Sequence, residues 1–82
     1  MIIVDINVFI LDKLYDFELN EDAKVREVIE EIVHMVEQKE RTSFTGNIAD
    51  IVLVDNFRRD ILDPDYTLAE QGIDSGWNLS LV

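Results

Sequence analysis

The chain has 82 residues, 48% of them hydrophobic, and its 18 acidic against 7 basic side chains give a formal charge of -11. This length predicts one small domain over residues 1–82, and the excess of acids argues against binding to nucleic acid, whose phosphates it repels. With no cysteine, no apolar run approaching the about 20 residues that span a bilayer and no recognisable signal peptide, we expect a cytoplasmic protein without disulfides or direct membrane insertion.

The first predicted element is a half-buried strand, because apolar and polar residues alternate with a period of two near the amino terminus. Its apolar positions are Val4, Ile6, Val8 and Ile10. The alternation resumes over residues 15–19 after a polar break, so the two runs predict a hairpin. Since no glycine lies between them, we expect a connection longer than two residues or one containing a bulge.

An amphipathic helix is predicted next, over about residues 22–40. Apolar side chains recur there at i, i+3 and i+4 and fill one stripe, while charged side chains occupy the opposite side. The stripe consists of Val25, Val28, Ile29, Ile32, Val33, Met35 and Val36. Asn20 and Asp22 are candidate amino-terminal caps for this helix.

Three short strands and one helical turn are predicted in the second half of the chain. The strands are expected at residues 51–54, 61–62 and 77–81. The first of these is wholly apolar, which favours a central strand covered on both faces. Thr67 and Glu70 have the spacing of a capping box, and Gly72 stands where a helical turn would stop. Trp77 could anchor an interface, but it shares its parity with Leu79 and Leu81, which favours packing at the edge of the core.

The predicted order of elements is therefore β-β-α-β-β-(short helix)-β. A lone hairpin cannot cover its own apolar face, so the helix must pack across the sheet. The fold class that follows is α+β, with a mixed sheet of four to five strands packed on one long helix, as in the β-grasp fold.

Two stretches of the second half carry a family resemblance. Residues 62–68 resemble the corresponding part of ubiquitin. The ending Gly-Ile-x-x-Gly-x-x-Leu-x-Leu is matched by Gly72, Ile73, Gly76, Leu79 and Leu81. This ending is similar to that of the YukD/EsaB family, ubiquitin-like proteins associated with the WXG100 (type VII) secretion systems of Gram-positive bacteria. The resemblance implies a ubiquitin-like, non-catalytic accessory or regulatory protein in the cytosol, whose partners are proteins such as secretion-system components.

Two other functions remain open at this stage. An acidic inhibitor or immunity-type protein would use the negative charge to block the basic active site of a toxin or nuclease. A ubiquitin-like modifier would need a flexible tail ending in two glycines, whereas residues 79–82 continue a predicted strand. We therefore expect no conjugation to other proteins.

No catalytic, cofactor-binding or metal-binding residue is predicted. Glu31 and His34 have the spacing of ligands in di-iron carboxylate sites. They point away from the apolar stripe of the only long helix, however, which favours an exposed histidine over a metal ligand. The chain also lacks a Walker loop and a dinucleotide-binding glycine motif. We therefore expect no enzyme activity and no cofactor.

Partner binding is predicted on the face of the sheet away from the helix. If the even-numbered residues of the first strand face the helix, the odd-numbered ones project to the other side, where one parity of the strand at 51–54 joins them. The candidate partner-binding residues are Ile3, Phe9, Val52 and Val54. Contiguous exposed apolar surface is typical of protein-binding sites, and a second copy of the chain, forming a homodimer, is the alternative partner.

Overall fold

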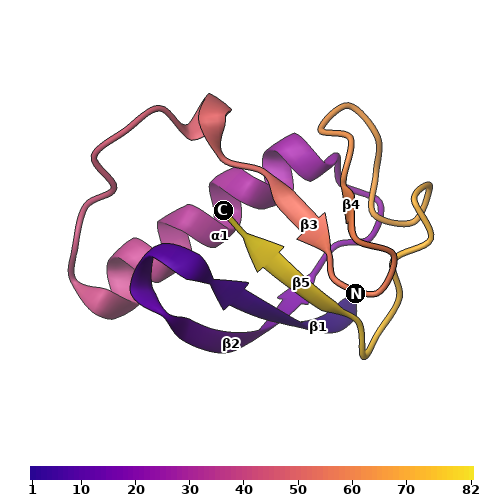
Figure 1. The fold of residues 1–82 in the computed structure, drawn as a ribbon, viewed down its shortest axis with the longest axis horizontal. Helices are drawn as coiled ribbons and strands as arrows, with labels where there is room; N and C mark the ends of the chain where they lie inside the picture. The colour runs from indigo at the N-terminus through magenta and orange to yellow at the C-terminus, as the bar shows by residue number, and fades with distance from the viewer.

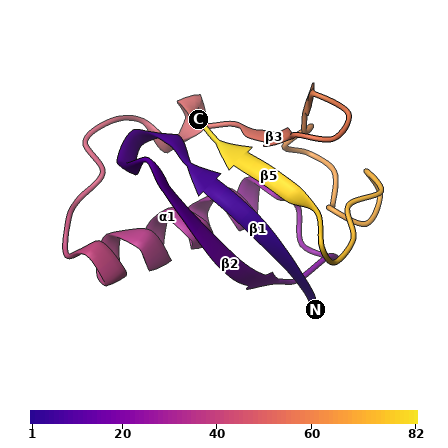
Figure 2. The same ribbon diagram turned by 60° about the horizontal axis from the view of Figure 1, so that its bottom comes forward.

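The computed structural model describes all residues from 1 to 82 and contains five strands, one α-helix and two short 3-10 turns (Figure 1). The elements are β1 (Ile2–Val8), η1 (Phe9–Leu11), β2 (Lys13–Leu19), α1 (Val25–Glu40), η2 (Ile48–Asp50), β3 (Leu53–Asp55), β4 (Asp60–Ile61) and β5 (Asn78–Leu81). The strands form one mixed sheet in the order β2-β1-β5-β3-β4, in which only β1 and β5 are parallel. Helix α1 lies across one face of this sheet (Figures 1 and 2). This confirms the predicted fold class and the predicted succession of the five strands and the long helix along the chain.

One core of 18 buried residues lies between α1 and the sheet. The period-two pattern of β1 meets the helical stripe there, because the even-numbered side chains of β1 all face α1. The buried residues of α1 are Val25, Val28, Ile29, Ile32, Val33 and Val36. Of the predicted stripe only Met35 is half-buried, so the orientation of the helix agrees with its sequence pattern.

Strand β1 ends at Val8, so the prediction that the first strand includes Ile10 is wrong. Val8 is the last residue of β1 to pair with β2, and Phe9–Leu11 form the turn η1. Asp12 then takes a left-handed conformation (φ 51°) and donates its amide to the carbonyl of Phe9 at 3.1 Å. The connection is longer than two residues, as the lack of glycine predicted. As a consequence, Ile10 is 78% exposed instead of buried.

The start of α1 also differs from the prediction, since the helix begins at Val25 and neither Asn20 nor Asp22 caps it. The Asn20 side chain instead accepts a hydrogen bond from the amide of Asp22 (2.9 Å) in the turn before the helix. The first helical amides, of Val25 and Arg26, donate to main-chain carbonyls. These acceptors are the carbonyls of Tyr66 (2.9 Å) and Pro64 (3.1 Å). Carbonyls from a distant segment therefore satisfy donors that a side-chain cap would otherwise bind.

The apolar run at 51–54 contributes only Leu53 and Val54 to β3, which ends at Asp55. Within this run Leu53 alone is buried, so the prediction of a strand covered on both faces is wrong. The physical reason is that α1 covers one face of the sheet and no element covers the other. Val52 extends the pairing by two hydrogen bonds with Val82 (2.9 and 3.0 Å).

The predicted capping box forms, but it closes a tight turn and not a helix. The amide of Glu70 donates to the Thr67 hydroxyl and the amide of Thr67 donates to the Glu70 carboxylate, each at 3.0 Å. The turn ends at Gly72, whose φ of 76° favours glycine. The turn packs Leu68 and Ile73 into the core. It directly follows Pro64 and Tyr66, whose carbonyls accept the first amides of α1.

Candidate functional site

The face of the sheet away from α1 is open, and its side chains can be assigned from the register of the strands. Leu53 pairs with Leu81 on the core side, so Val52 and Val54 project from the open face. Ile61 of β4 lies opposite Val54 and is 66% exposed. We call Val52, Val54 and Ile61 the apolar strip. The strip includes two of the four residues predicted from the sequence, and Ile61 is an addition.

Polar side chains occupy the middle of the open face and interrupt its apolar surface. Val54 pairs with Ser80, and Ser80 pairs in turn with Asn7 of β1. Ile3 is 55% exposed but lies toward the other end of β1, beyond Asp5 on the same face. The expectation of one contiguous surface that includes Ile3 and the two valines is therefore wrong, because Asp5, Asn7, Asn78 and Ser80 separate them.

Phe9 does not belong to the open face either, since it lies in η1 beyond the end of β1. There it lines a pocket of about 590 Å³ between η1, the second half of α1, the connection after α1 and the end of β5. Ten of the 15 lining residues are hydrophobic, among them Phe9, Ile10, Val36, Phe44, Ile51 and Leu81. We call this cavity the end pocket. Both figures of the whole chain show the connection after α1 arching around this end of the molecule.

The wall of the end pocket formed by Phe44 depends on a contact that the sequence did not reveal. The Glu37 carboxylate accepts a hydrogen bond from the amide of Phe44 (2.6 Å), and the Glu37 carbonyl accepts one from the amide of Thr42 (3.0 Å). These bonds hold Phe44 against the core. The only signal in the sequence is a single aromatic residue within a mostly polar connection, which does not by itself predict a pocket.

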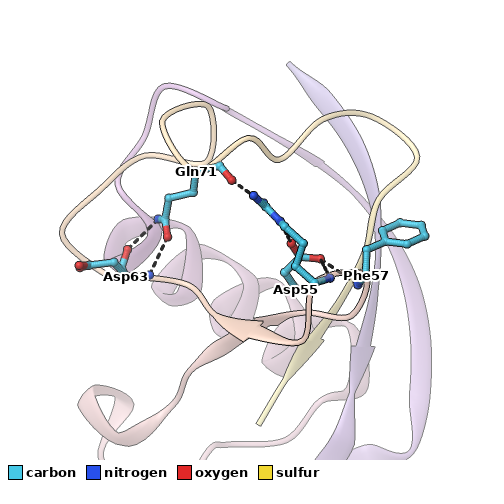
Figure 3. A network of polar contacts seen from close by, with 5 residues as sticks. Asp55, Phe57, Asp63 and Gln71 are labelled. Carbon is cyan, nitrogen blue, oxygen red and sulfur yellow. Dashed lines mark hydrogen bonds and ion pairs between the residues drawn. The ribbon is translucent and has the colours of Figure 1, made fainter.

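A buried carboxylate organises the hairpin between β3 and β4. Asp55 is fully buried, and its side chain accepts hydrogen bonds from the amides of Phe57 (2.9 Å) and Arg58 (3.3 Å) and from the Arg58 guanidinium (2.6 Å) (Figure 3). The guanidinium also donates to the carbonyl of Gln71 (2.5 Å). The side-chain oxygen of Gln71 accepts the amide of Asp63 (2.7 Å), and the side-chain nitrogen of Gln71 donates to the carbonyl of Asp63 (2.9 Å). The network therefore connects this hairpin to the turn that ends at Gly72.

Burial alone would raise the pKa of the Asp55 carboxyl, but its partners reverse this effect. The hydrogen bond and positive charge of Arg58, with the amide hydrogen bonds of Phe57 and Arg58, hold the pKa of Asp55 below its usual value of 3.8. Asp55 is therefore a structural anion, and its ion pair fixes the hairpin.

An aromatic corner of Phe57, Arg58 and Trp77 lies on the outside of this network. Phe57 is 68% exposed and packs edge to face on Trp77, with ring centroids 5.2 Å apart. The Arg58 guanidinium lies 5.0 Å from the centroid of the Trp77 ring. Trp77 is half-buried against the core, which confirms the prediction for its position. Aromatic and arginine side chains of this kind are enriched among residues that dominate binding energy at protein interfaces.

A pair of carboxyl groups, Asp5 and Asp16, lies directly across β1 and β2 on the open face, at the β2 edge of the sheet. A hydrogen bond with Asp16 raises the pKa of the Asp5 carboxyl, and the negative charge of Asp16 and partial desolvation add to this effect. Because the folded pKa is the higher one, this pair lowers stability as the pH rises through that pKa.

We expect Asp16→Asn to raise the melting temperature at neutral pH, because it removes the charge beside Asp5. The gain should fade as the pH falls toward 3.8, where Asp5 becomes neutral in the unfolded chain as well. Thermal unfolding followed by circular dichroism across this pH range measures the effect. Glu18→Gln is the matched control, since Glu18 lies on the same face of β2 but opposite Ile3. An equal gain from both variants would contradict the assignment to this pair.

Glu31 and His34, the spaced pair in α1, are both exposed. No group of three or more histidine, cysteine, aspartate or glutamate side chains is arranged to hold a metal ion. None of the helices combines the length and hydrophobicity that crossing a membrane requires.

Comparison with protein families gives one match along nearly the whole chain. Residues 3–81 match the family described as "WXG100 protein secretion system (Wss), protein YukD". No curated protein shows significant sequence similarity to the chain. The matched range contains the apolar strip, the aromatic corner and most of the end pocket.

Solved structures with the same fold include ubiquitin-like domains at low sequence identity. The N-terminal ubiquitin-like domain of the 4931431F19Rik protein is 22% identical, with a TM-score of 0.75, over 99% of this chain and 72% of that one. A ubiquitin-like domain from Arabidopsis thaliana is 21% identical, with a TM-score of 0.73, over 99% and 74%. A designed protein based on human erythrocytic ubiquitin is 29% identical, with a TM-score of 0.70, over 100% and 90%. These similarities confirm the ubiquitin-like fold.

Proposed function

Because the chain belongs to the YukD family of the WXG100 protein secretion system, we propose that it is a non-catalytic protein-interaction module that acts in the cytoplasm as an accessory or regulatory component of type VII secretion. The match over residues 3–81 is the observation that carries this proposal. Fold similarity alone would leave the function open, since one fold serves many functions.

The surface that best supports protein binding is the apolar strip, and Phe57 of the aromatic corner belongs to the same β3–β4 hairpin. The exposed side chains Ile61 and Phe57 come from one hairpin, and Val54 lies opposite Ile61. Apolar side chains that gather on an otherwise charged surface are typical of interaction sites. The Asp55 network fixes this hairpin in place, so a partner would meet an ordered surface and binding would cost little conformational entropy.

The charge of the chain supports a partner with a basic surface. The acidic side chains outnumber the basic ones by 18 to 7, and two of them, Asp5 and Asp16, lie on the open face in β1 and β2. Complementary charge of this kind raises association rates and rejects acidic competitors. Ile3 lies apart from the strip and is expected to contribute less than Val54.

Affinity purification of the tagged chain from its native cells, followed by mass spectrometry, tests this function. We expect secretion-system proteins to be enriched with the wild-type chain and lost with Ile61→Asp, because a carboxylate in the strip would have to be desolvated on binding. Leu14→Asp is the matched control, since Leu14 is a similarly exposed apolar residue (61%) on the edge strand β2. This control should retain the enrichment.

Two results would contradict the proposal. Enrichment of a single toxin or nuclease, without secretion components, would identify an acidic inhibitor. A concentration-dependent homodimer that dissociates on Ile61→Asp, with no other protein enriched, would show that a second copy covers the strip.

A further inference from the structure

The end pocket is a second apolar surface, separate from the apolar strip. No residue of the strip lines it, and its lining comes from the end of β1, η1, α1, the connection between α1 and β3, and the end of β5. Its volume of about 590 Å³ falls within the range of about 300–1,000 Å³ that is usual for ligand sites. The pocket therefore has the size and the apolar lining of a binding site.

Hydrogen bonds hold three walls of the pocket in place. The carbonyl of Phe9 accepts the amide of Asp12 in the η1 wall. The Glu37 carboxylate accepts the amide of Phe44 (2.6 Å) in the wall formed by the connection after α1. Val52 and Val82 exchange two main-chain hydrogen bonds beside Leu81. A ligand would therefore enter a cavity that is already formed, which favours binding because little must be ordered.

The exposed rim favours a protein segment over a small ligand. Phe9 is 61% exposed and Ile10 is 78% exposed at the edge of the pocket. A small molecule confined to the cavity would leave much of these two side chains in water. A protein segment lying over the opening would cover them while placing its own apolar side chains inside.

The charge of the lining decides which kind of segment fits. Glu37 and Asp50 are among the lining residues, and no lysine, arginine or histidine is. A second copy of the chain is disfavoured, because it carries the same formal charge of -11. An apolar segment flanked by basic residues complements both the cavity and its rim.

We propose that the end pocket binds an amphipathic protein segment that places large apolar side chains in the cavity and lysine or arginine side chains beside Glu37 and Asp50. This inference rests on the proposed function only in taking the partner to be a protein. It adds a second contact, in addition to the apolar strip, and states the chemistry of the segment that binds in the pocket.

The proposal can be tested with a synthetic helical peptide. The peptide carries leucine at positions i, i+3, i+4 and i+7 and lysine at the flanking positions. Calorimetric titration should show binding to the wild-type chain, and Phe9→Asp and Ile10→Asp should each weaken it at least about tenfold. Leu14→Asp is the matched control because Leu14 has the same 61% exposure as Phe9 but does not line the pocket. This control should bind the peptide as the wild type does, and circular dichroism should show that all three variants are folded.

The charge requirement is tested with a second peptide in which glutamate replaces every lysine. It should bind at least about tenfold more weakly, and added salt should weaken the binding of the lysine peptide. Equal binding of the two peptides, or equal effects of Phe9→Asp and Leu14→Asp, would overturn the proposal. Self-association that Phe9→Asp abolishes would assign the pocket to a second copy.

The two proposals fail in distinguishable ways. If secretion components copurify in a manner that depends on Ile61 while neither peptide binds, the end pocket is not a binding site and the proposed function stands. If the lysine peptide binds at the pocket while no secretion component copurifies, the pocket stands and the proposed function is wrong.

Discussion

Replacing Ile32 by alanine is expected to lower the free energy of unfolding by about 2–5 kcal/mol, the usual cost of truncating a buried isoleucine. Ile32 is completely buried at the middle of α1, within the one core between the helix and the sheet. The substitution removes apolar contact and leaves a cavity that a small core closes poorly. Since domains of this size are stable by only about 5–15 kcal/mol, this loss is a large fraction of the total stability. Chemical denaturation measures it.

Two matched variants make this measurement specific. Glu31→Ala changes the neighbouring, exposed position of the same helix and should alter stability by no more than about 0.5 kcal/mol. Ile32→Val removes one methylene and should cost about 0.5–1.5 kcal/mol. If Ile32→Ala were as mild as Glu31→Ala, the packing of α1 on the sheet would be wrong.

The faces of the strands and of the helix were predictable because they follow from local periodicity. An even-numbered residue of β1 and an i, i+4 pair of α1 face the core whatever lies further along the chain. Val4 and Ile32 are buried for this reason, and the ending with Gly72 and Leu81 indicated the family. Pattern and family resemblance together were thus sufficient for the fold.

The ends of the elements depend on contacts between distant residues and were less predictable. Strand β1 stops at Val8 because its pairing with β2 stops there, and no local feature of Phe9 or Ile10 marks that end. The start of α1 is fixed by the carbonyls of Pro64 and Tyr66. These carbonyls lie 38 and 41 residues along the chain from the amides that they accept, so the search for a local side-chain cap led to the wrong residues.

The candidate sites inherit these limits. Phe9 was placed on the open face by extending the alternation past the end of β1, and in the structure it lines the end pocket. The apolar strip lacks Ile3 because Asp5 and the polar residues of β5 intervene. The pocket itself depends on how the connection after α1 folds back, and the hydrogen bond from the amide of Phe44 to the Glu37 carboxylate is one contact that holds it there. Single side-chain contacts of that kind leave no period in a sequence.

Substitution of Asp55 is the second change expected to lower the free energy of unfolding strongly. Its carboxylate is fully buried and accepts hydrogen bonds from three donor groups. Removing one partner of a buried ion pair costs about 3–5 kcal/mol. The side chain of Arg58 is 47% exposed and can turn toward water, so we expect Asp55→Ala to cost about 3 kcal/mol, at the lower end of that range. Glu30→Gln, at an exposed carboxylate of α1, is the control for loss of a negative charge alone and should be nearly neutral.

The dependence on pH separates the role of the charge from that of packing. Because the folded pKa of Asp55 lies below 3.8, its ionised form stabilises the protein fully above that value, and the contribution is lost as the pH falls through the folded pKa. Urea denaturation of the wild type and of Asp55→Asn should therefore differ most at neutral pH, and the difference should shrink steadily below 3.8. If the difference in unfolding free energy stayed constant in acid, the shape of the side chain, and not its charge, would stabilise the hairpin. If the difference shrinks, the ion pair between Asp55 and Arg58 is what holds Phe57 and the rest of the aromatic corner in place.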